Sequence, residues 1–233
     1  MVDYEGYYAR ISEAASDARL QEAIGKAIDN YERKKREWLE RIGRIPELAK
    51  ALEEKRRADV DDLAENVERA VEAMRYNGMK VFHARTADEA RRIVLDLVGD
   101  ERLVTKVKSL TTEEIGLNEF LQARGIEVWE TDVGAILLQL THGKAAHPTG
   151  LCISTPKERF AEEFGRMAGR EIGTRPEDLG AYIREFVRSK VTGARVAISG
   201  ANAITADTGS IYLLTNEGND RLVTSWPEKH IVL

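Results

Sequence analysis

The residues best suited to hold a small anion lie between Lys106 and Asn118. Lys106 follows an apolar segment, and the hydroxyl side chains of Ser109, Thr111 and Thr112 come next, at the predicted start of a helix. The free N–H groups of a helix start attract anions, and a nearby ammonium group adds positive charge. We therefore predict a loop that binds a carboxylate or phosphate through Lys106, Ser109, Thr111, Thr112, Glu113 and Asn118. The competing interpretation is that Thr111 only caps the helix and that the lysines are solvated.

A second stretch, from Ser199 to Ser210, combines small residues with polar ones. Its glycines allow a backbone to approach a ligand or to adopt a positive φ. The predicted ligand-binding residues here are Gly200, Asn202, Thr208, Gly209 and Ser210. Asp207 is the predicted proton acceptor, since a buried carboxylate beside hydroxyls can act as a base. A tight β-turn that hydrogen-bonds to its own backbone is the alternative.

His147 and His230 both lie near strand or loop ends, and either could carry a proton. His147 is the second catalytic candidate beside Asp207. Any single histidine is more often structural. No two histidines have the spacing of a helical metal pair, so no metal site is predicted. The single cysteine, Cys152, can form neither an internal disulfide nor a four-thiolate iron–sulfur site. The chain itself is therefore expected to bind no cofactor.

The elements that must position these loops follow a strand–helix alternation. Strands are predicted at 79–84, 103–107 and 126–129, and capping-box spacings at Thr86 and Thr111 open the helices between them. This alternation is typical of a parallel or mixed Rossmann-like sheet with helices on its faces. Ligands bind such a sheet beyond the carboxyl ends of its strands, so we expect the two polar stretches to converge there.

The two ends of the chain differ from this middle part. Residues 1–59 predict a charged helical extension, and 60–233 the α/β domain. Helices are also predicted at 158–168 and 179–190, and residues 132–140 fit either a helix or a strand. Three β runs are predicted at 195–199, 210–215 and 221–224, the last two joined by a hairpin turn at 216–219. The final apolar residues, 231–233, begin a strand, and we expect the sequence to be truncated there.

Composition excludes several classes of protein. The formal net charge is -5, and aromatic residues make up 6% with no interleaved basic patch, so nucleic acid and membrane surfaces are not expected partners. No apolar run is long enough to span a bilayer, and the N-terminus lacks a signal-peptide pattern. A cytoplasmic protein is the expectation.

The two polar stretches resemble the signature of the LUD family, and most closely its type-B lactate-utilization proteins. The similarity runs from Lys106 to Asn118 and from Gly200 to Ser210, and continues through Asn216 and Glu217 to His230. The resemblance implies the fold of the sugar-phosphate isomerase and CoA-transferase superfamily. It also implies a role in oxidising L-lactate to pyruvate with partner subunits, and it adds Asn216 and Glu217 to the ligand-binding set.

Two departures from the family pattern qualify this resemblance. Ser154 stands where many members have a second histidine, seven residues after His147, and Asp207 stands where many have glutamate. The type-B proteins also carry a downstream ferredoxin-like region. A 4Fe-4S cluster is thus expected only in such a region or in a partner protein.

Three hypotheses on function follow. The first is a component of lactate oxidation that binds a small carboxylate or organises an iron–sulfur oxidoreductase. The second is a non-catalytic binding or assembly module, and the third an isomerase or transferase acting on a phosphorylated or CoA-linked substrate. Whether the chain is itself an enzyme stays open, and a homo-oligomer formed through the N-terminal helices is expected.

Overall fold

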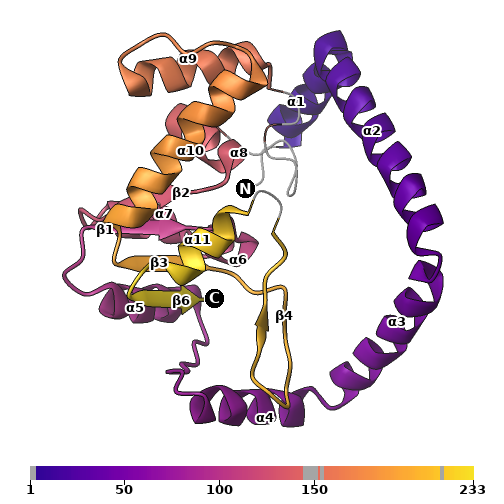
Figure 1. Ribbon diagram of the computed structural model, residues 1–233, viewed down its shortest axis with the longest axis vertical. Helices are drawn as coiled ribbons and strands as arrows, with labels where there is room; N and C mark the ends of the chain where they lie inside the picture. The colour runs from indigo at the N-terminus through magenta and orange to yellow at the C-terminus, as the bar shows by residue number, and fades with distance from the viewer. Residues whose placement is uncertain (1–3, 144–151, 153–154, 216–217) are drawn as a thin grey trace.

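The computed structural model describes residues 4–143, 152, 155–215 and 218–233. At its centre lies a four-stranded sheet in the order β2-β1-β3-β6, in which every neighbouring pair is parallel (Figure 1). Its strands are β1 (Leu103–Lys106), β2 (Glu127–Glu130), β3 (Val196–Ser199) and β6 (Lys229–Val232). The predicted α/β class with a Rossmann-like parallel sheet is confirmed.

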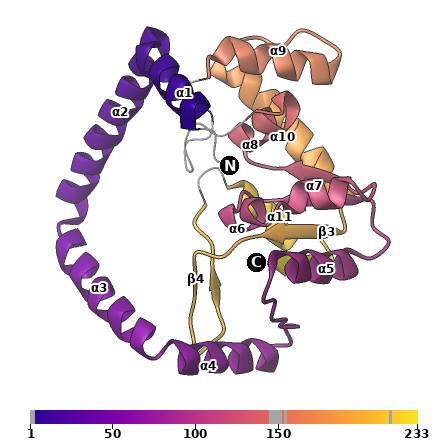
Figure 2. The same ribbon diagram turned by 180° about the vertical axis from the view of Figure 1, so that it is seen from behind.

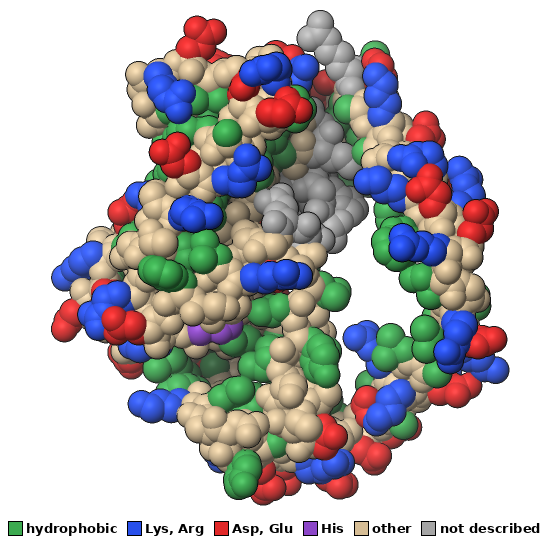
Figure 3. All heavy atoms as spheres, viewed as in Figure 1, with side chains coloured by type: hydrophobic (Ala, Val, Ile, Leu, Met, Phe, Trp, Pro, Cys, Tyr) green, Lys and Arg blue, Asp and Glu red, His purple; other side chains and the backbone are tan. Residues whose placement is uncertain are grey.

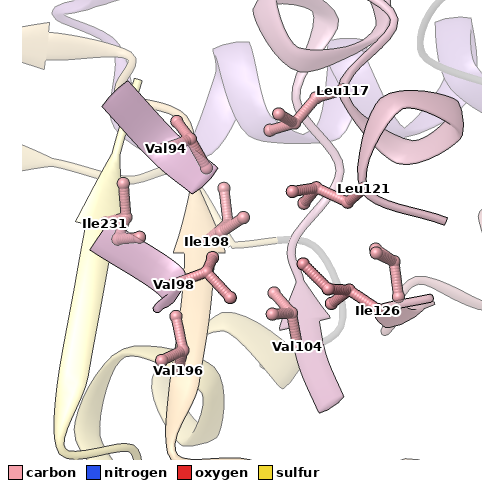
Figure 4. Packing of buried hydrophobic residues seen from close by; sticks show 10 residues of the cluster. Val94, Val98, Val104, Leu117, Leu121, Ile126, Val196, Ile198 and Ile231 are labelled. Carbon is pink, nitrogen blue, oxygen red and sulfur yellow. The ribbon is translucent and has the colours of Figure 1, made fainter. Parts of the chain in front are cut away.

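Helices cover both faces of this sheet. On one face lie α5 (Ala87–Val98), α6 (Leu110–Glu114) and α7 (Leu117–Gln122). Figure 4 shows Val94 and Val98 of α5 and Leu117 and Leu121 of α7 packed against the strands. On the other face, α10 (Pro176–Gly193) and α11 (Asn219–Ser225) bury Val191 and Val223 against Ala197. The branched apolar residues of the strands thus end up between two helical layers.

A second apolar cluster joins the sheet to α8 (Val133–Thr141) and α9 (Lys157–Ala168). Ile136, Phe164 and Ile183 are buried there, with Trp129 of β2 packed against them. The ambiguous segment 132–140 is therefore helical, and the helices predicted at 158–168 and 179–190 are confirmed. Asp132 begins α8 by accepting a hydrogen bond from the Ala135 N–H at 3.1 Å.

The strand order creates a switch point between β1 and β3. From β1 the chain moves outward to β2, then returns to place β3 on the opposite side of β1. In an open parallel sheet, the crevice at the carboxyl ends of two such strands is where ligands bind. The carboxyl ends of β1 and β3 are Lys106 and Ser199, which start the two polar stretches.

The N-terminal helices form an arm that curves away from this body (Figures 1 and 2). The arm consists of α1 (Tyr4–Ser16), α2 (Ala18–Ile42), α3 (Ile45–Asp61) and α4 (Leu63–Tyr76). Pro46 lies in the first turn of α3, where its missing N–H costs nothing. The described part of the predicted extension 1–59 is helical, and the helices continue past it to Tyr76; none of the arm's described side chains is buried.

Two predicted strands are wrong. Residues 79–84 form no strand; they connect α4 to α5 with no neighbouring strand to pair with. Residues 221–224 belong to α11, because Gly218 takes the left-handed conformation before the helix and Val223 is buried against the sheet face. Tertiary packing overrides the β-branched composition of this segment.

The remaining corrections concern turns and caps. Only Ile211–Tyr212 of the run 210–215 is a strand, β5, and it pairs antiparallel with β4 (Ala203–Ile204). The predicted hairpin at 216–219 is wrong, since Asn219 starts α11. Thr86 caps α5 as predicted. The cap of α6, however, is Ser109 rather than Thr111, because α6 begins at Leu110.

Candidate functional site

The loop after β1 and the loop after β3 meet at the switch point. The Val107 N–H donates to the Ile198 carbonyl at 2.9 Å, which keeps the first loop beside β3. A Cβ placed on Gly200 would lie 2.8 Å from Ser109 Oγ and 3.1 Å from Ser109 Cβ. Glycine is therefore required for this close approach of the two polar stretches. We call the two loops, with the ends of β2 and β6 beside them, the rim.

Lys106 points into the protein. Its side chain is fully buried, and its Nζ lies 2.7 Å from Glu130 Oε1 and 2.9 Å from Thr112 Oγ1. Glu130 is the register neighbour of Lys106 on β2, so the two side chains share one face of the sheet. Because the ammonium group is already paired, it holds α6 and β2 together and is not placed to contact a ligand directly.

Two oxygens of this buried cluster have no protein hydrogen-bond partner among the described residues. Asn118 Nδ2 donates to Glu130 Oε1 at 2.8 Å, while Glu130 Oε2 and Asn118 Oδ1 receive no hydrogen bond. Buried acceptors without partners raise the energy of the folded state. The stability of this cluster therefore depends strongly on the positive charge of Lys106.

On the opposite face, Ser199 and His230 form a second polar pair. Ser199 Oγ donates to the Gly200 carbonyl at 3.0 Å and lies 2.7 Å from His230 Nε2. With the single Ser199 proton donated to the Gly200 carbonyl, the matching tautomer of the ring donates its Nε2–H to Ser199. His230 Nδ1 then carries a lone pair and can accept a proton. Burial lowers the pKa of His230 from its usual value, which favours this neutral form.

A hydrogen-bonded strap ties α11 to the rim. Asn219 Nδ2 donates to Thr131 Oγ1 at 2.9 Å, and the Thr131 hydroxyl donates to the Lys106 carbonyl at 3.0 Å. Thr131 directly follows β2, and Asn219 is the first residue of α11. The ends of β1 and β2 and the start of α11 are thus held together at one edge of the sheet.

The other predicted residues of the second stretch lie elsewhere. The β4–β5 hairpin extends away from the sheet and ends on α4 (Figure 1). Its tip and α4 line a surface hollow of about 830 Å³ that includes Asp207, Thr208 and Ser210. Asn77, the C-cap residue of α4, donates from Nδ2 to the Thr208 carbonyl at 2.8 Å. Asn202 stays within the hairpin, where its Oδ1 accepts from the Leu214 N–H. Lys106 and Asp207 therefore do not share one pocket.

The structure thus divides the predicted site residues into several groups. Ser109 and Gly200 come together at the rim, with the buried Lys106 and Thr112 and the half-buried Asn118 beneath it. Thr111 and Glu113 are exposed on α6. Asn202, Asp207, Thr208, Gly209 and Ser210 lie on the hairpin. His147, Asn216 and Glu217, together with Ser154, lie outside the described residues.

Glu130, Thr131, Ser199 and Asn219 were not among the predicted site residues, and His230 was predicted only as an alternative proton carrier. The rule that ligands bind at strand ends could have found Glu130 and Thr131, which end and follow the third predicted strand. Ser199 ends a predicted strand and carries the same signal, but its contact with His230 could not be foreseen because it depends on the register of β3 and β6. No group of His, Cys, Asp or Glu within the described parts of the chain is arranged to hold a metal ion.

The lowered pKa of His230 predicts a specific dependence of stability on pH. The unfolded chain binds a proton near the usual histidine pKa of about 6.5, whereas the folded chain binds it only at lower pH. Stability should therefore fall as pH drops below about 6.5, by at most about 1.4 kcal/mol per pH unit. Urea unfolding from pH 8 to pH 5 should show this slope, and His230→Gln should lose it. An unchanged slope in the variant would assign the pH dependence to other groups.

None of the helices in the described ranges is long and apolar enough to cross a bilayer.

Comparisons with known proteins place the chain in a family. The family model for the LUD domain matches residues 67–233. Lactate utilization protein B of Bacillus licheniformis is 33% identical over 227 residues, which cover 96% of this chain and 48% of that protein. The Bacillus subtilis protein of the same name is 31% identical over 232 residues, covering 98% and 48%.

A third relative has a different name. The uncharacterized electron transport protein YkgF of Escherichia coli is 31% identical over 229 residues, which cover 97% of this chain and 48% of that protein. The chain thus spans about half the length of the curated relatives it matches, and these alignments extend into the helical arm. No solved structure matches significantly, so the superfamily assignment stays a prediction. The match over residues 67–233, with the relatives' identity over almost the whole chain, shows that the chain belongs to the LUD domain family.

Proposed function

We propose that this chain serves lactate utilization by binding a small hydroxy or keto acid at the rim. The observation that carries this proposal is the close contact of Ser109 and Gly200 at the switch point between β1 and β3. Ser109 Oγ accepts from the Thr112 N–H at 3.4 Å, which leaves its own proton available to donate to a carboxylate. Relatives named for lactate utilization support the substrate class.

Oxidation of a hydroxy acid requires a proton acceptor and an electron acceptor. Converting L-lactate to pyruvate removes two electrons and two protons. We assign the hydroxyl proton to His230, a histidine inside β6 whose ring contacts Ser199 at the carboxyl end of β3. The Cα proton is released to solvent, and the two electrons go to redox centres supplied by a partner, for which a 4Fe-4S protein, carrying one electron per cluster, is the expected class.

The binding site is tested by single substitutions at the rim. Ser109→Ala should weaken binding of L-lactate or pyruvate by up to about tenfold, the value of one hydrogen bond. Gly200→Ala should weaken it by about tenfold or more, because the new methyl group displaces Ser109. Isothermal titration calorimetry measures both effects. Asp207→Asn is the matched control, and it should leave affinity unchanged because Asp207 lies on the hairpin against α4.

Two results would contradict the proposal. The rim is not the site if both rim variants bind either acid as tightly as the unmodified chain. If Asp207→Asn alone abolishes binding, the site lies on the hairpin instead. A reconstituted assay with partner subunits and an electron acceptor then separates turnover from binding.

A second candidate function, assembly of a larger complex, is favoured by the helical arm, which carries no buried residue in its described part. The two functions are compatible, because the rim and the arm are different surfaces.

A further inference from the structure

A buried ion pair lies directly beneath Ser109, the residue that the proposed function places against the substrate. Figure 3 shows charged side chains spread over the surface of one face of the molecule. Lys106 and Glu130 are exceptions, since their side chains are only 1% and 6% exposed. Burying two charges costs desolvation energy, and apolar side chains of similar size hold neighbouring strands together as well. The position of the pair indicates a role at the rim.

The ion pair is connected to Ser109 by hydrogen bonds. Asn118 Nδ2 and Lys106 Nζ both donate to Glu130 Oε1, at 2.8 and 2.7 Å. The ammonium group also donates to Thr112 Oγ1 at 2.9 Å, and the Thr112 hydroxyl donates to the Ser109 carbonyl at 2.7 Å. We call Asn118, Glu130, Lys106 and Thr112 the buried network.

The charge of Lys106 fixes the direction of the Thr112 hydroxyl. An ammonium group can only donate hydrogen bonds, so it occupies a lone pair of Thr112 Oγ1. The single proton of this hydroxyl therefore points elsewhere, and the Ser109 carbonyl is the acceptor that it meets. Without the lysine, the Thr112 hydroxyl could turn to other partners. Lys106 thus acts on Ser109 through Thr112 and needs no contact with a ligand.

The Thr112 hydroxyl makes the shortest of three hydrogen bonds that fix Ser109 to α6. The Thr112 N–H lies 3.4 Å from Ser109 Oγ, which is longer than the usual N–H···O range of about 2.7–3.2 Å. The Glu113 N–H lies 3.2 Å from the Ser109 carbonyl, whereas Thr112 Oγ1 lies 2.7 Å from it. The position of Ser109 therefore depends mainly on the buried network.

Held in this way, Ser109 presents a proton to the rim. Its Oγ accepts the Thr112 N–H and lies next to Gly200, where a Cβ would come within 2.8 Å of it. The hydroxyl proton of Ser109 has no acceptor among the described residues that could compete with a ligand. A group that presents a proton suits a carboxylate, which can only accept hydrogen bonds.

We propose that Thr112 is a positioning residue for the substrate: oriented by Lys106, it holds Ser109 as a hydrogen-bond donor and makes the rim prefer an ionised carboxylate. This inference rests on the proposed function, because it requires that Ser109 contacts the substrate. A donor that is already oriented strengthens binding, since the hydroxyl does not have to be ordered when the ligand arrives.

A double-mutant cycle tests whether Thr112 acts through Ser109. Thr112→Val keeps the branched shape and removes the hydroxyl, so it should weaken binding of L-lactate by about five- to tenfold, near the value of one hydrogen bond. In a Ser109→Ala background the same change should have no further effect, because the group that Thr112 positions is gone. Thr112→Ser keeps the hydroxyl and should bind within about twofold of the unmodified chain. Isothermal titration calorimetry measures each variant.

Thr105→Val is the matched control. Thr105 is fully buried on β1, and its hydroxyl has no hydrogen-bond partner in the part of the chain that the structure describes. The same substitution there should leave the affinity for L-lactate unchanged, because Thr105 and Lys106 point to opposite faces of the sheet. Thr112→Ala repeats the test with a smaller side chain, and urea unfolding checks that each variant is folded in the titration.

The preference for an anion gives a second measurement. The unmodified chain should bind L-lactate at least about tenfold more tightly than L-lactamide, because a hydrogen bond to a charged acceptor is stronger. In Thr112→Val, Ser109 can turn and accept from the amide NH₂, so this ratio should fall by about threefold or more. Thr112→Ser should restore it. A general loosening of the rim would weaken both ligands equally and leave the ratio unchanged.

Three results would overturn the role of Thr112. It is wrong if Thr112→Val binds L-lactate as tightly as the unmodified chain, if this change weakens the Ser109→Ala chain by the same factor, or if the ratio for lactate over lactamide does not change. The rim remains the site in these cases as long as Ser109→Ala weakens binding. Unchanged affinity in Ser109→Ala would instead overturn the proposed function, and the role of Thr112 with it.

Discussion

Lys106→Met is expected to lower the free energy of unfolding by about 3–5 kcal/mol, since it leaves a buried carboxylate without its cation. Glu130 is 5% exposed, and its Oε1 lies 2.7 Å from Lys106 Nζ. Its Oε2 has no protein hydrogen-bond partner among the described residues, so no protein group is placed to take over the role of the ammonium. Such a loss is a large part of the roughly 5–15 kcal/mol that stabilises a typical domain. Urea unfolding measures it.

The double variant Lys106→Met with Glu130→Met is the matched control. Replacing both charges by apolar groups of similar size should recover most of the loss, because no charge then stays buried. A loss below about 1 kcal/mol in Lys106→Met, the range of surface ion pairs, would show that water reaches the cluster.

Gly209→Ala is expected to destabilise the contact between the β4–β5 hairpin and α4 by about 2–4 kcal/mol. Gly209 has a φ of 65°, which an L-residue with a side chain adopts at a cost. A Cβ there would lie 2.6 Å from Met74 N and 2.9 Å from Ala73 C, both backbone atoms that cannot rotate away. The hairpin or α4 must therefore move.

Gly169→Ala separates the cost of a positive φ from the cost of a steric clash of the new Cβ. Gly169 has a similar φ of 64°, but a Cβ there would meet nothing within 4 Å, so its substitution should cost only about 1 kcal/mol. Hydrogen exchange should show faster exchange in the hairpin for Gly209→Ala and not for Gly169→Ala. Equal losses of stability in the two variants would mean that the hairpin does not depend on its contact with α4.

The Ser109–Gly200 contact shows how far the sequence predicts the site. Both residues follow apolar segments that read as strands, and carboxyl ends of parallel strands share one edge of a sheet. Their meeting could therefore be expected without coordinates. Asp207 could not be placed in the same way, because the loop that carries it forms a hairpin whose tip binds α4, about 130 residues earlier in the chain.

Local signals alone determined the helical arm, the cap at Thr86 and the parallel α/β sheet, because spacing and capping depend on residues a few positions apart. Only the tertiary structure decided that Lys106 would be paired with Glu130, that Ser199 would contact the ring of His230, and that residues 221–224 would be helical. Each of these outcomes depends on which segments become neighbours in the sheet and its layers. Which segments become neighbours is determined by the apolar surface that parts distant in the chain bury together.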